Sequence, residues 1–286
     1  MKIHCLIENT CSSSELKSEH GLSLLIEAGG HRILFDTGAS ASFAENAERM
    51  GLDLITVDSA ILSHGHYDHG GGLERFLEIN HKARVWASPH AFEPHFNASG
   101  KDIGLPPALQ ANPRIQLSAA PVIELYPGIT LHQGLQVPMM HPAPDAGMST
   151  MQEGNRIPDD FRHEQYLLIQ EGDKRILLSG CSHRGILNIV QHFQPDILLG
   201  GFHLMKETDA GRIAQLAEAL LQFPTVYYTA HCTGEWAASI MQQRMGSRLR
   251  TFSTGDCLCK ALAETEKSKN QDSTSFTNPN FPCFHH

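Results

Sequence analysis

The pattern of apolar and polar positions in the first third of the chain predicts short strands joined by tight turns. Residues 22–28 and 32–35 are mostly apolar and lie on either side of a Gly-Gly pair, which is a strong hairpin signal. Ser40 can cap a helix that runs to about Met50. The pattern further predicts strands at residues 60–62 and 84–87 and a helix at residues 73–77.

A second block with a similar layout begins near residue 166. Residues 166–170 and 175–179 flank a polar turn and predict another hairpin. Further elements are predicted as helices at 184–193 and 209–222 and strands at 196–199 and 225–229. The intervening residues 88–161 are rich in Pro, Gly and Asn and predict loops and a lid, with strands at 122–125 and 128–131. This alternation favours a mixed α/β fold.

Composition narrows the class of protein. The chain has 286 residues, of which 41% are hydrophobic and 19% charged, as in globular proteins. Its net charge of -9 argues against nucleic acid as a partner. No apolar run has the eighteen or so residues needed to span a bilayer, and the first residues do not resemble a signal peptide. We therefore expect a cytoplasmic protein whose seven cysteines are free thiols.

The run S-H-G-H-Y-D-H-G-G-G at residues 63–72 is the strongest chemical signal. His64, His66, Asp68 and His69 lie within six residues, directly after an apolar strand. In an extended segment the first three of these side chains point toward one face. Imidazoles and a carboxylate at this density suit zinc or iron. A polar loop that happens to be rich in histidine is the alternative interpretation.

Three later segments each place a histidine after an apolar strand and a small turn. They end at His183, His203 and His231. Adjacent strands of an α/β fold bring residues at their carboxyl ends together, so these histidines can join the first motif. Taken singly, each histidine is better explained by a structural role or as a partner of a helix cap.

The chain resembles the metallo-β-lactamase-fold proteins. The resemblance rests on Asp36-Thr37-Gly38 at a strand end, the H-x-H-x-D-H motif and the late strand that ends at His231. The segments at residues 19–23, 180–183 and 231–234 are similar to those of the dihydropterin synthase-like, ribofuranosyl-aminobenzene 5′-phosphate synthase-related branch of metal-dependent hydrolases. The resemblance implies a four-layer αββα sandwich, formed as a single domain by residues 1–262, with a flexible tail at 263–286.

The resemblance also implies a set of ligands for divalent metal. The first ion, most simply zinc, with iron or manganese as alternatives, would be held by His64, His66 and His183. A second ion, if one binds, would be held by Asp68, His69 and His231. Two departures bear on this expectation. The chain lacks the G-H-[TS] segment of most relatives, and Gly180-Cys181 stands where a Gly-Asp pair usually provides a carboxylate that bridges two metals.

The resemblance implies a hydrolase that directs a metal-activated water at a small ester, amide or phosphate-containing substrate, with a pterin-related compound as one candidate. Asp68 would orient the water or act as general base, and His203 would bind substrate or protonate the leaving group. Asp36 would support a ligand from behind. Glu19, His20 and Cys181 are weaker candidates for the substrate pocket. An iron-dependent oxidoreductase and a non-catalytic binding or signalling protein remain alternatives, and the oligomeric state is open.

Overall fold

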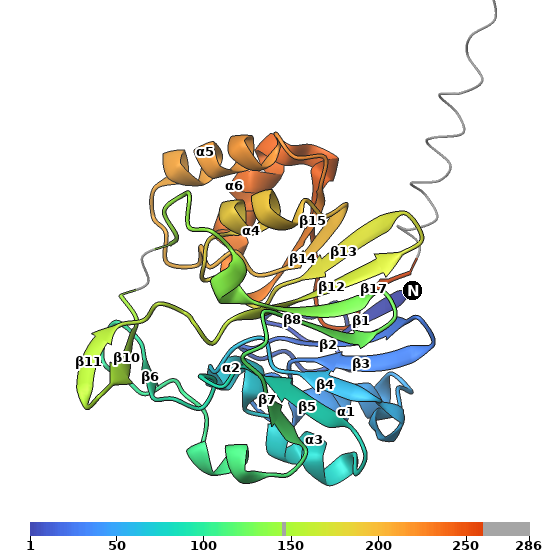
Figure 1. Ribbon diagram of the computed structural model, residues 1–286. Helices are drawn as coiled ribbons and strands as arrows, with labels where there is room; N and C mark the ends of the chain where they lie inside the picture. The colour runs from blue at the N-terminus through green and yellow to red at the C-terminus, as the bar shows by residue number, and fades with distance from the viewer. Residues whose placement is uncertain (145–146, 260–286) are drawn as a thin grey trace, which may run out of the picture.

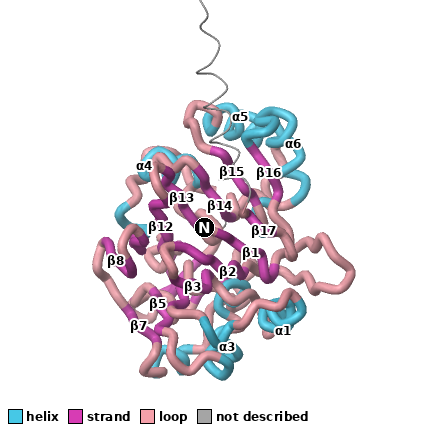
Figure 2. Tube along the Cα trace, turned by 90° about the vertical axis from the view of Figure 1, so that its right-hand side faces the viewer, coloured by secondary structure: helices cyan, strands magenta, loops and turns pink. Residues whose placement is uncertain are grey.

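A computed structural model describes residues 1–144 and 147–259. Two seven-stranded sheets pack face to face, and helices cover the outer face of each (Figure 1). The same order of layers is visible after a quarter turn, where α1 and α3 lie on one side of the strands and α4, α5 and α6 on the other (Figure 2). The predicted αββα sandwich is confirmed. The tail expected at residues 263–286 lies outside the described residues.

The first sheet has the strand order β17-β1-β2-β3-β4-β5-β7. Its strands are β1 (Lys2–Ile7), β2 (Ser23–Ala28), β3 (His31–Phe35), β4 (Ser59–Ile61), β5 (Arg84–Ala87), β7 (Ile115–Leu117) and β17 (Cys257–Leu258). The predicted hairpin is present, with Ala28 paired to His31 across the Gly-Gly turn. The strands from β3 to β7 are parallel, so their carboxyl ends share one edge of the sheet.

The helices of the first layer are α1 (Ser42–Arg49), α2 (Tyr67–Gly70) and α3 (Leu73–Ile79). The first of these begins one residue later than predicted, with Ala41 and not Ser40 at the N-cap position. Ser40 donates its hydroxyl hydrogen bond to Glu19 and accepts the backbone N–H of Ser42, so its side chain organises the turn before the helix. Phe43 and Phe76 are fully buried between these helices and the sheet.

The second sheet has the strand order β16-β15-β14-β13-β12-β9-β8. Its strands are β8 (Val122–Tyr126), β9 (Ile129–Gln133), β12 (Gln165–Glu171), β13 (Lys174–Leu178), β14 (Ile197–Gly200), β15 (Val226–Thr229) and β16 (Leu249–Thr251). It is covered by α4 (Ile186–Phe193), α5 (Ala210–Leu220) and α6 (Glu235–Met245). Strands β13 to β16 are parallel and present their carboxyl ends at one edge.

The main core lies between the two sheets. Leu24 and Ile26 of β2 contribute to it from the first sheet, and Ile169 of β12 and Leu199 of β14 from the second. Burial of such side chains is the main favourable contribution to folding, at about 25 cal/mol for each Å² of apolar surface removed from water. None of the helices in residues 1–144 and 147–259 is long and apolar enough to cross a membrane.

A small third sheet was not predicted. It consists of β6 (His95–Phe96), β10 (Ser149–Gln152) and β11 (Asn155–Pro158), in the order β11-β10-β6. It projects beside α2 and lies apart from the two large sheets (Figure 1). Its strands are short and mostly polar, so the sequence contains no alternation of apolar and polar residues long enough to predict them.

Candidate metal centre

The candidate site lies where the carboxyl-terminal edges of the two large sheets meet. The H-x-H-x-D-H run follows β4 and continues into α2, while His183 follows β13 and His231 follows β15. Every one of the histidines at positions 64, 66, 69, 183 and 231 is at least 97% buried. Side chains from the two halves of the chain therefore converge in one buried space, as the strand-to-histidine pattern predicts.

The residues predicted for a first metal lie together. The Nε2 atoms of His64 and His183 are 3.4 Å apart. The ring of His66 lies beside both, with centroid distances of 4.5 Å to His64 and 5.0 Å to His183. One ligand atom from each of the three lies within 4.8 Å of the others, which is close enough to share a cation.

The residues predicted for a second metal lie directly beside the first group. The Nε2 atoms of His69 and His231 are 3.1 Å apart. Asp68 places Oδ2 3.2 Å from His231 Nε2 and 3.3 Å from His20 Nε2. The two groups adjoin one another, because the ring centroids of His64 and His69 are 4.1 Å apart.

Hydrogen bonds behind the rings fix which nitrogen faces the shared space. Asp36 Oδ2 accepts a hydrogen bond from His69 Nδ1 at 2.7 Å and another from the Ser63 hydroxyl at 2.6 Å. Because that hydroxyl donates to Asp36, it accepts from His64 Nδ1, at 2.9 Å. Asn9 Oδ1 accepts from His231 Nδ1, also at 2.9 Å. These three imidazoles are therefore held with Nε2 directed inward.

This arrangement fits a divalent cation. Two Nε2 atoms that face each other at 3.1 or 3.4 Å repel through their lone pairs unless a proton or a cation lies between them. Neutral imidazoles oriented through their Nδ1 atoms are the usual ligands of zinc, with the hydrogen-bonded partner fixing the tautomer. Asp36 thus supports two of the rings from behind, in the position expected from the sequence.

The pKa shifts agree with this chemistry. Burial lowers the pKa of His64, His66 and His183 well below the usual value, so these rings are neutral and free to ligate. Burial opposes the charged form of His69 as well, but the Asp36 and Asp68 carboxylates outweigh it and raise the pKa. In the metal-free protein, a proton on His69 can therefore fill the gap that a cation would fill.

Backbone strain is concentrated at the same place. Asp36, Ser182, His203 and His231 have φ between 53° and 59°, in the left-handed region that non-glycine residues avoid. Such a conformation costs on the order of 1–3 kcal/mol at each position and persists where the surrounding structure enforces it. The fold thus accepts strain in order to aim these side chains inward.

Comparisons with known proteins agree on the family. The family model of the metallo-β-lactamase superfamily matches residues 18–155. A 7,8-dihydropterin-6-methyl-4-(beta-D-ribofuranosyl)-aminobenzene-5′-phosphate synthase of Methanocaldococcus jannaschii is 32% identical over 277 residues, covering 85% of this chain and 91% of that protein. The chain belongs to the metallo-β-lactamase superfamily. The resemblance seen in the sequence, including the branch that it indicates, is confirmed.

Solved structures show the same superfamily fold. A metal-dependent hydrolase of the β-lactamase superfamily has a TM-score of 0.79 and 29% identity, over 91% of this chain and 98% of that one. Zn(2+)-bound PqqB from Methylobacterium extorquens has a TM-score of 0.56 at 14% identity, over 91% of this chain and all of that one. At this low identity the similarity supports a shared fold and nothing about function. This superfamily fold implies binding of a divalent metal, and the histidine and aspartate clusters provide the ligands.

Cys181 lies inside the site, where superfamily relatives usually carry a bridging aspartate. Its Sγ is 3.2 Å from His69 Nε2, and it forms a possible ligand group with His64 and His69. A second thiol, Cys232, contacts the backbone carbonyl of Cys181 at 3.6 Å. Burial raises the pKa of Cys181 well above its usual value, and the neighbouring Cys232 adds to the effect. If Cys181 held a cation, this shift would be reversed, since a coordinating thiol is deprotonated.

The other predicted residues have distinct surroundings. His203 is half-buried, and its ring lies 4.5 Å from that of His183. His20 is exposed and contacts Asp68 at the rim of the site. Glu19 has both carboxylate oxygens engaged by the turn before α1, where they accept from the backbone and hydroxyl of Ser40. A substrate-binding role for these residues stays a prediction.

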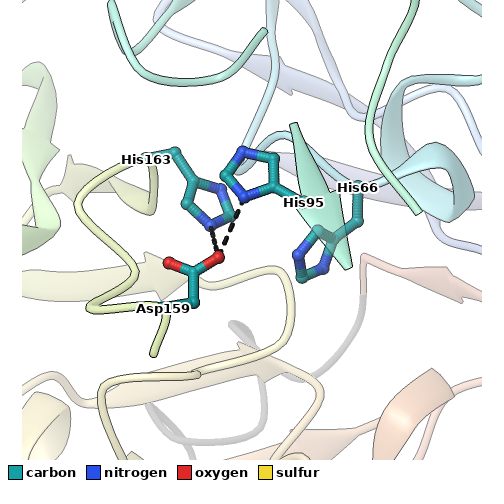
Figure 3. Close-up of side chains that lie close together, drawn as sticks. All are labelled: His66, His95, Asp159 and His163. Atoms are coloured by element: carbon teal, nitrogen blue, oxygen red, sulfur yellow. Dashed lines mark hydrogen bonds and ion pairs between the residues drawn. The ribbon is translucent and has the colours of Figure 1, made fainter. Parts of the chain in front are cut away.

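Sequence reasoning missed three buried polar residues beside the site. His95, Asp159 and His163 form a group with His66 (Figure 3). His163 lies between the first motif and Gly180-Cys181, the interval in which most relatives carry their further histidine, although it lacks the G-H-[TS] flanks. That interval was the one available signal, because His95 and Asp159 lie in segments without a motif.

Proposed function

We propose that this protein is a metal-dependent hydrolase of a small-molecule substrate, with zinc as the best-fitting cation. One observation carries the proposal: two pairs of inward-facing Nε2 atoms lie side by side. The two atoms are 3.4 Å apart in the pair of His64 and His183, and 3.1 Å apart in the pair of His69 and His231. Two adjacent groups of this kind suit one ion or a pair of ions. The similarity to a metal-dependent hydrolase with a TM-score of 0.79 supports the same reaction class.

A divalent cation bound here supplies Lewis acidity, which lowers the pKa of water and stabilises negative charge on a substrate oxygen. The protein's own groups complete the chemistry. Asp68 Oδ2 lies between His231 and His20, where it can accept a proton from an attacking water. Burial opposes the charged form of Asp68, but His69, His20 and His231 outweigh it and hold the pKa well below its usual value. Asp68 is therefore ionised and suited to orient that water.

His203 is the candidate for contact with the substrate. Burial lowers its pKa to about 4, so the ring is neutral near pH 7 and can donate one hydrogen bond. It lies against His183, at the rim of the predicted first metal site. A neutral ring in this position binds a substrate oxygen or the leaving group without adding charge.

A second candidate function is a condensation on a pterin-related substrate. The Methanocaldococcus jannaschii relative, which is 32% identical, is named as a synthase of a dihydropterin linked to a ribofuranosyl-aminobenzene phosphate. The same cation and the same residues can stabilise charge on a phosphate-containing substrate in a hydrolysis or in a condensation. The hydrolase and the synthase therefore differ in the acceptor, which is water in one and an organic nucleophile in the other.

The test combines metal analysis with turnover. Protein purified without oxygen is analysed for zinc, iron and manganese, then assayed with phosphodiesters, phosphomonoesters and esters. It is also assayed with a dihydropterin that carries a leaving group, such as a diphosphate ester, plus an aminobenzene riboside phosphate, with release of the leaving group measured. We expect zinc-dependent hydrolysis that is lost, together with bound metal, in His64→Ala and His231→Ala. The exposed His81 provides the control, and His81→Ala should retain both. Bound iron with oxygen consumption, or condensation without hydrolysis, would contradict the hydrolase.

A further inference from the structure

Three buried side chains outside the two ligand groups described above converge with a fourth that belongs to the first group. His95 lies on β6, Asp159 follows β11 directly, and His163 lies two residues before β12. The fourth is His66 of the first motif, whose ring faces the other three (Figure 3). One ligand atom from each lies within 4.8 Å of all the others. The side chains of His95, Asp159 and His163 are at most 1% exposed.

The spacing of these atoms is that of ligands around one ion. Asp159 Oδ2 is 2.9 Å from His95 Nδ1 and 3.4 Å from His163 Nε2. In a tetrahedral zinc site with metal–ligand distances of about 2.0–2.1 Å, neighbouring ligand atoms are about 3.3 Å apart. Burial opposes the charged form of Asp159, but the adjacent His163 and His95 rings outweigh it and hold the pKa far below its usual value. The group therefore includes a fixed negative charge.

Hydrogen bonds assign a different role to each ring. His95 Nε2 donates to the backbone carbonyl of His90 at 3.3 Å, which leaves Nδ1 as the atom facing Asp159. His163 Nδ1 accepts the backbone N–H of Gly65 at 2.9 Å, so its own proton lies on Nε2, which is 3.4 Å from Asp159 Oδ2 but makes no hydrogen bond. His95 Nδ1 donates to Asp159 Oδ2 at 2.9 Å, so in the metal-free protein His95 is the ring that is hydrogen-bonded to the carboxylate.

His66 provides the observation that points to a ligand. His66 is only 3% exposed, and its Nε2 atom is buried without a hydrogen-bond partner, even though an ionised carboxylate lies nearby. A buried polar atom without a partner costs about 1–3 kcal/mol. A cation bound by this nitrogen, His95 Nδ1 and Asp159 Oδ2 would give the His66 atom a partner. It would take the place of the proton that His95 donates to Asp159, which would leave to solvent.

We propose that His66, His95 and Asp159 form a third cation site, of the two-histidine, one-carboxylate type, with His163 packed beside the carboxylate. The ligand chemistry suits zinc, with water completing the coordination. His66 also borders His64 and His183, so its ring lies between the third site and the predicted first metal site. The site would fasten the small sheet of β6, β10 and β11 to the first motif.

Diffraction at the zinc edge tests the site in the wild-type chain. Crystals grown with zinc should show an anomalous peak about 2.0–2.2 Å from His95 Nδ1 and Asp159 Oδ2. No peak there overturns the third site, whatever is found elsewhere. A peak there without any peak beside His64, His183, His69 or His231 would support this inference and contradict the proposed function.

Elemental analysis of variants gives an independent measurement. After zinc loading and dialysis, Asp159→Asn and His95→Ala should each hold about one zinc ion fewer per chain than wild type. His90→Ala is the matched control, because it removes a nearby histidine side chain and keeps the carbonyl that His95 contacts. Equal zinc content in the two site variants and in His90→Ala overturns the proposal. Amide hydrogen exchange in β10 and β11 should also accelerate in both site variants but not in the control.

Discussion

Asp36 Oδ2 lies 2.7 Å from His69 Nδ1 and accepts its hydrogen bond, with both side chains fully buried. The same carboxylate oxygen binds the hydroxyl of Ser63, which in turn accepts from His64. One acidic residue thereby sets the orientation of a ligand in each of the two groups. Its backbone is held in the left-handed region, so the chain bends to bring it there.

Removing the charge of Asp36 should weaken metal binding at both groups. Both carboxylate oxygens of Asp36 are acceptors, Oδ1 for the Ser63 backbone N–H and Oδ2 for the Ser63 hydroxyl and His69. Asp36→Asn keeps the shape of the side chain but replaces one of these oxygens with an NH2 group, which cannot accept. Loss of such a supporting contact typically costs about 10–100-fold in metal affinity. Competition with a chromophoric chelator measures the change. Asp53→Asn, at an exposed turn, is the control, and equal weakening in both variants would contradict the role of Asp36.

A methyl group at Gly180 should disrupt the same relay. An added Cβ would overlap the Ser63 hydroxyl oxygen and approach His64 Nδ1 to 3.0 Å. Gly180→Ala should therefore lower zinc affinity about tenfold or more, and destabilise the fold by about 1–3 kcal/mol through overpacking. Zinc titration and urea unfolding measure the two effects. Gly211→Ala adds its methyl beside an exposed carboxylate on α5 and should change neither by much.

Cys181 should ligate the metal as a thiolate. Its sulfur lies 3.2 Å from His69 Nε2, within the group that includes His64. We expect cobalt-loaded protein to show a sulfur-to-cobalt charge-transfer band that Cys181→Ser lacks. Cys257→Ser changes an exposed thiol and should leave the band intact. A spectrum without this band in the wild type would show that Cys181 only packs against the site.

The metal-free protein should lose stability as the pH falls from about 6.5 to about 4. Burial lowers the pKa of His163, His203 and His231 to about 4, whereas an unfolded histidine titrates near 6.5. Between these values the unfolded chain binds protons that the folded chain does not. The free energy of unfolding then falls by up to about 1.4 kcal/mol per pH unit for each ring, and above 6.5 these rings contribute no pH dependence.

Urea unfolding after removal of metal with a chelator measures this dependence. His203→Gln removes one of the three rings without touching the Asp36 relay, so its stability should fall less steeply with pH. The same slope in the variant and the wild type would show that His203 is protonated in the folded protein, against the expectation from its burial.

The sequence was most informative where chemistry and local pattern coincide. The Gly-Gly pair placed the hairpin of β2 and β3, and a strand followed by a small turn located His183 and His231. The resemblance of Asp36-Thr37-Gly38 to the metallo-β-lactamase fold implied that Asp36 supports a ligand from behind, and in the structure it accepts a hydrogen bond from His69. These features depend on residues close together in the chain, where the period of the pattern reports the backbone directly.

Features that depend on contacts between distant parts of the chain could not be predicted from the sequence. Asn9 follows β1 in a polar turn without a motif, yet it orients His231 across 222 positions of the chain. His95 and Asp159 approach each other from segments 64 positions apart, on strands too short to show a period. No local pattern encodes such pairings, since they arise only when the two sheets and the small sheet have packed.

The facing pairs of the metal centre have a mechanical consequence. His64 and His183 are separated by 119 positions in the chain, and His69 and His231 by 162. In each pair the first histidine belongs to the layer of the first large sheet, and the second follows a strand of the second large sheet. A cation shared by either pair is a cross-link that closes a very long loop, much as a disulfide does, and it restricts the unfolded chain accordingly. Unlike a disulfide, it can be removed by a chelator. The supply of metal would then set how tightly the two halves of the molecule are clamped.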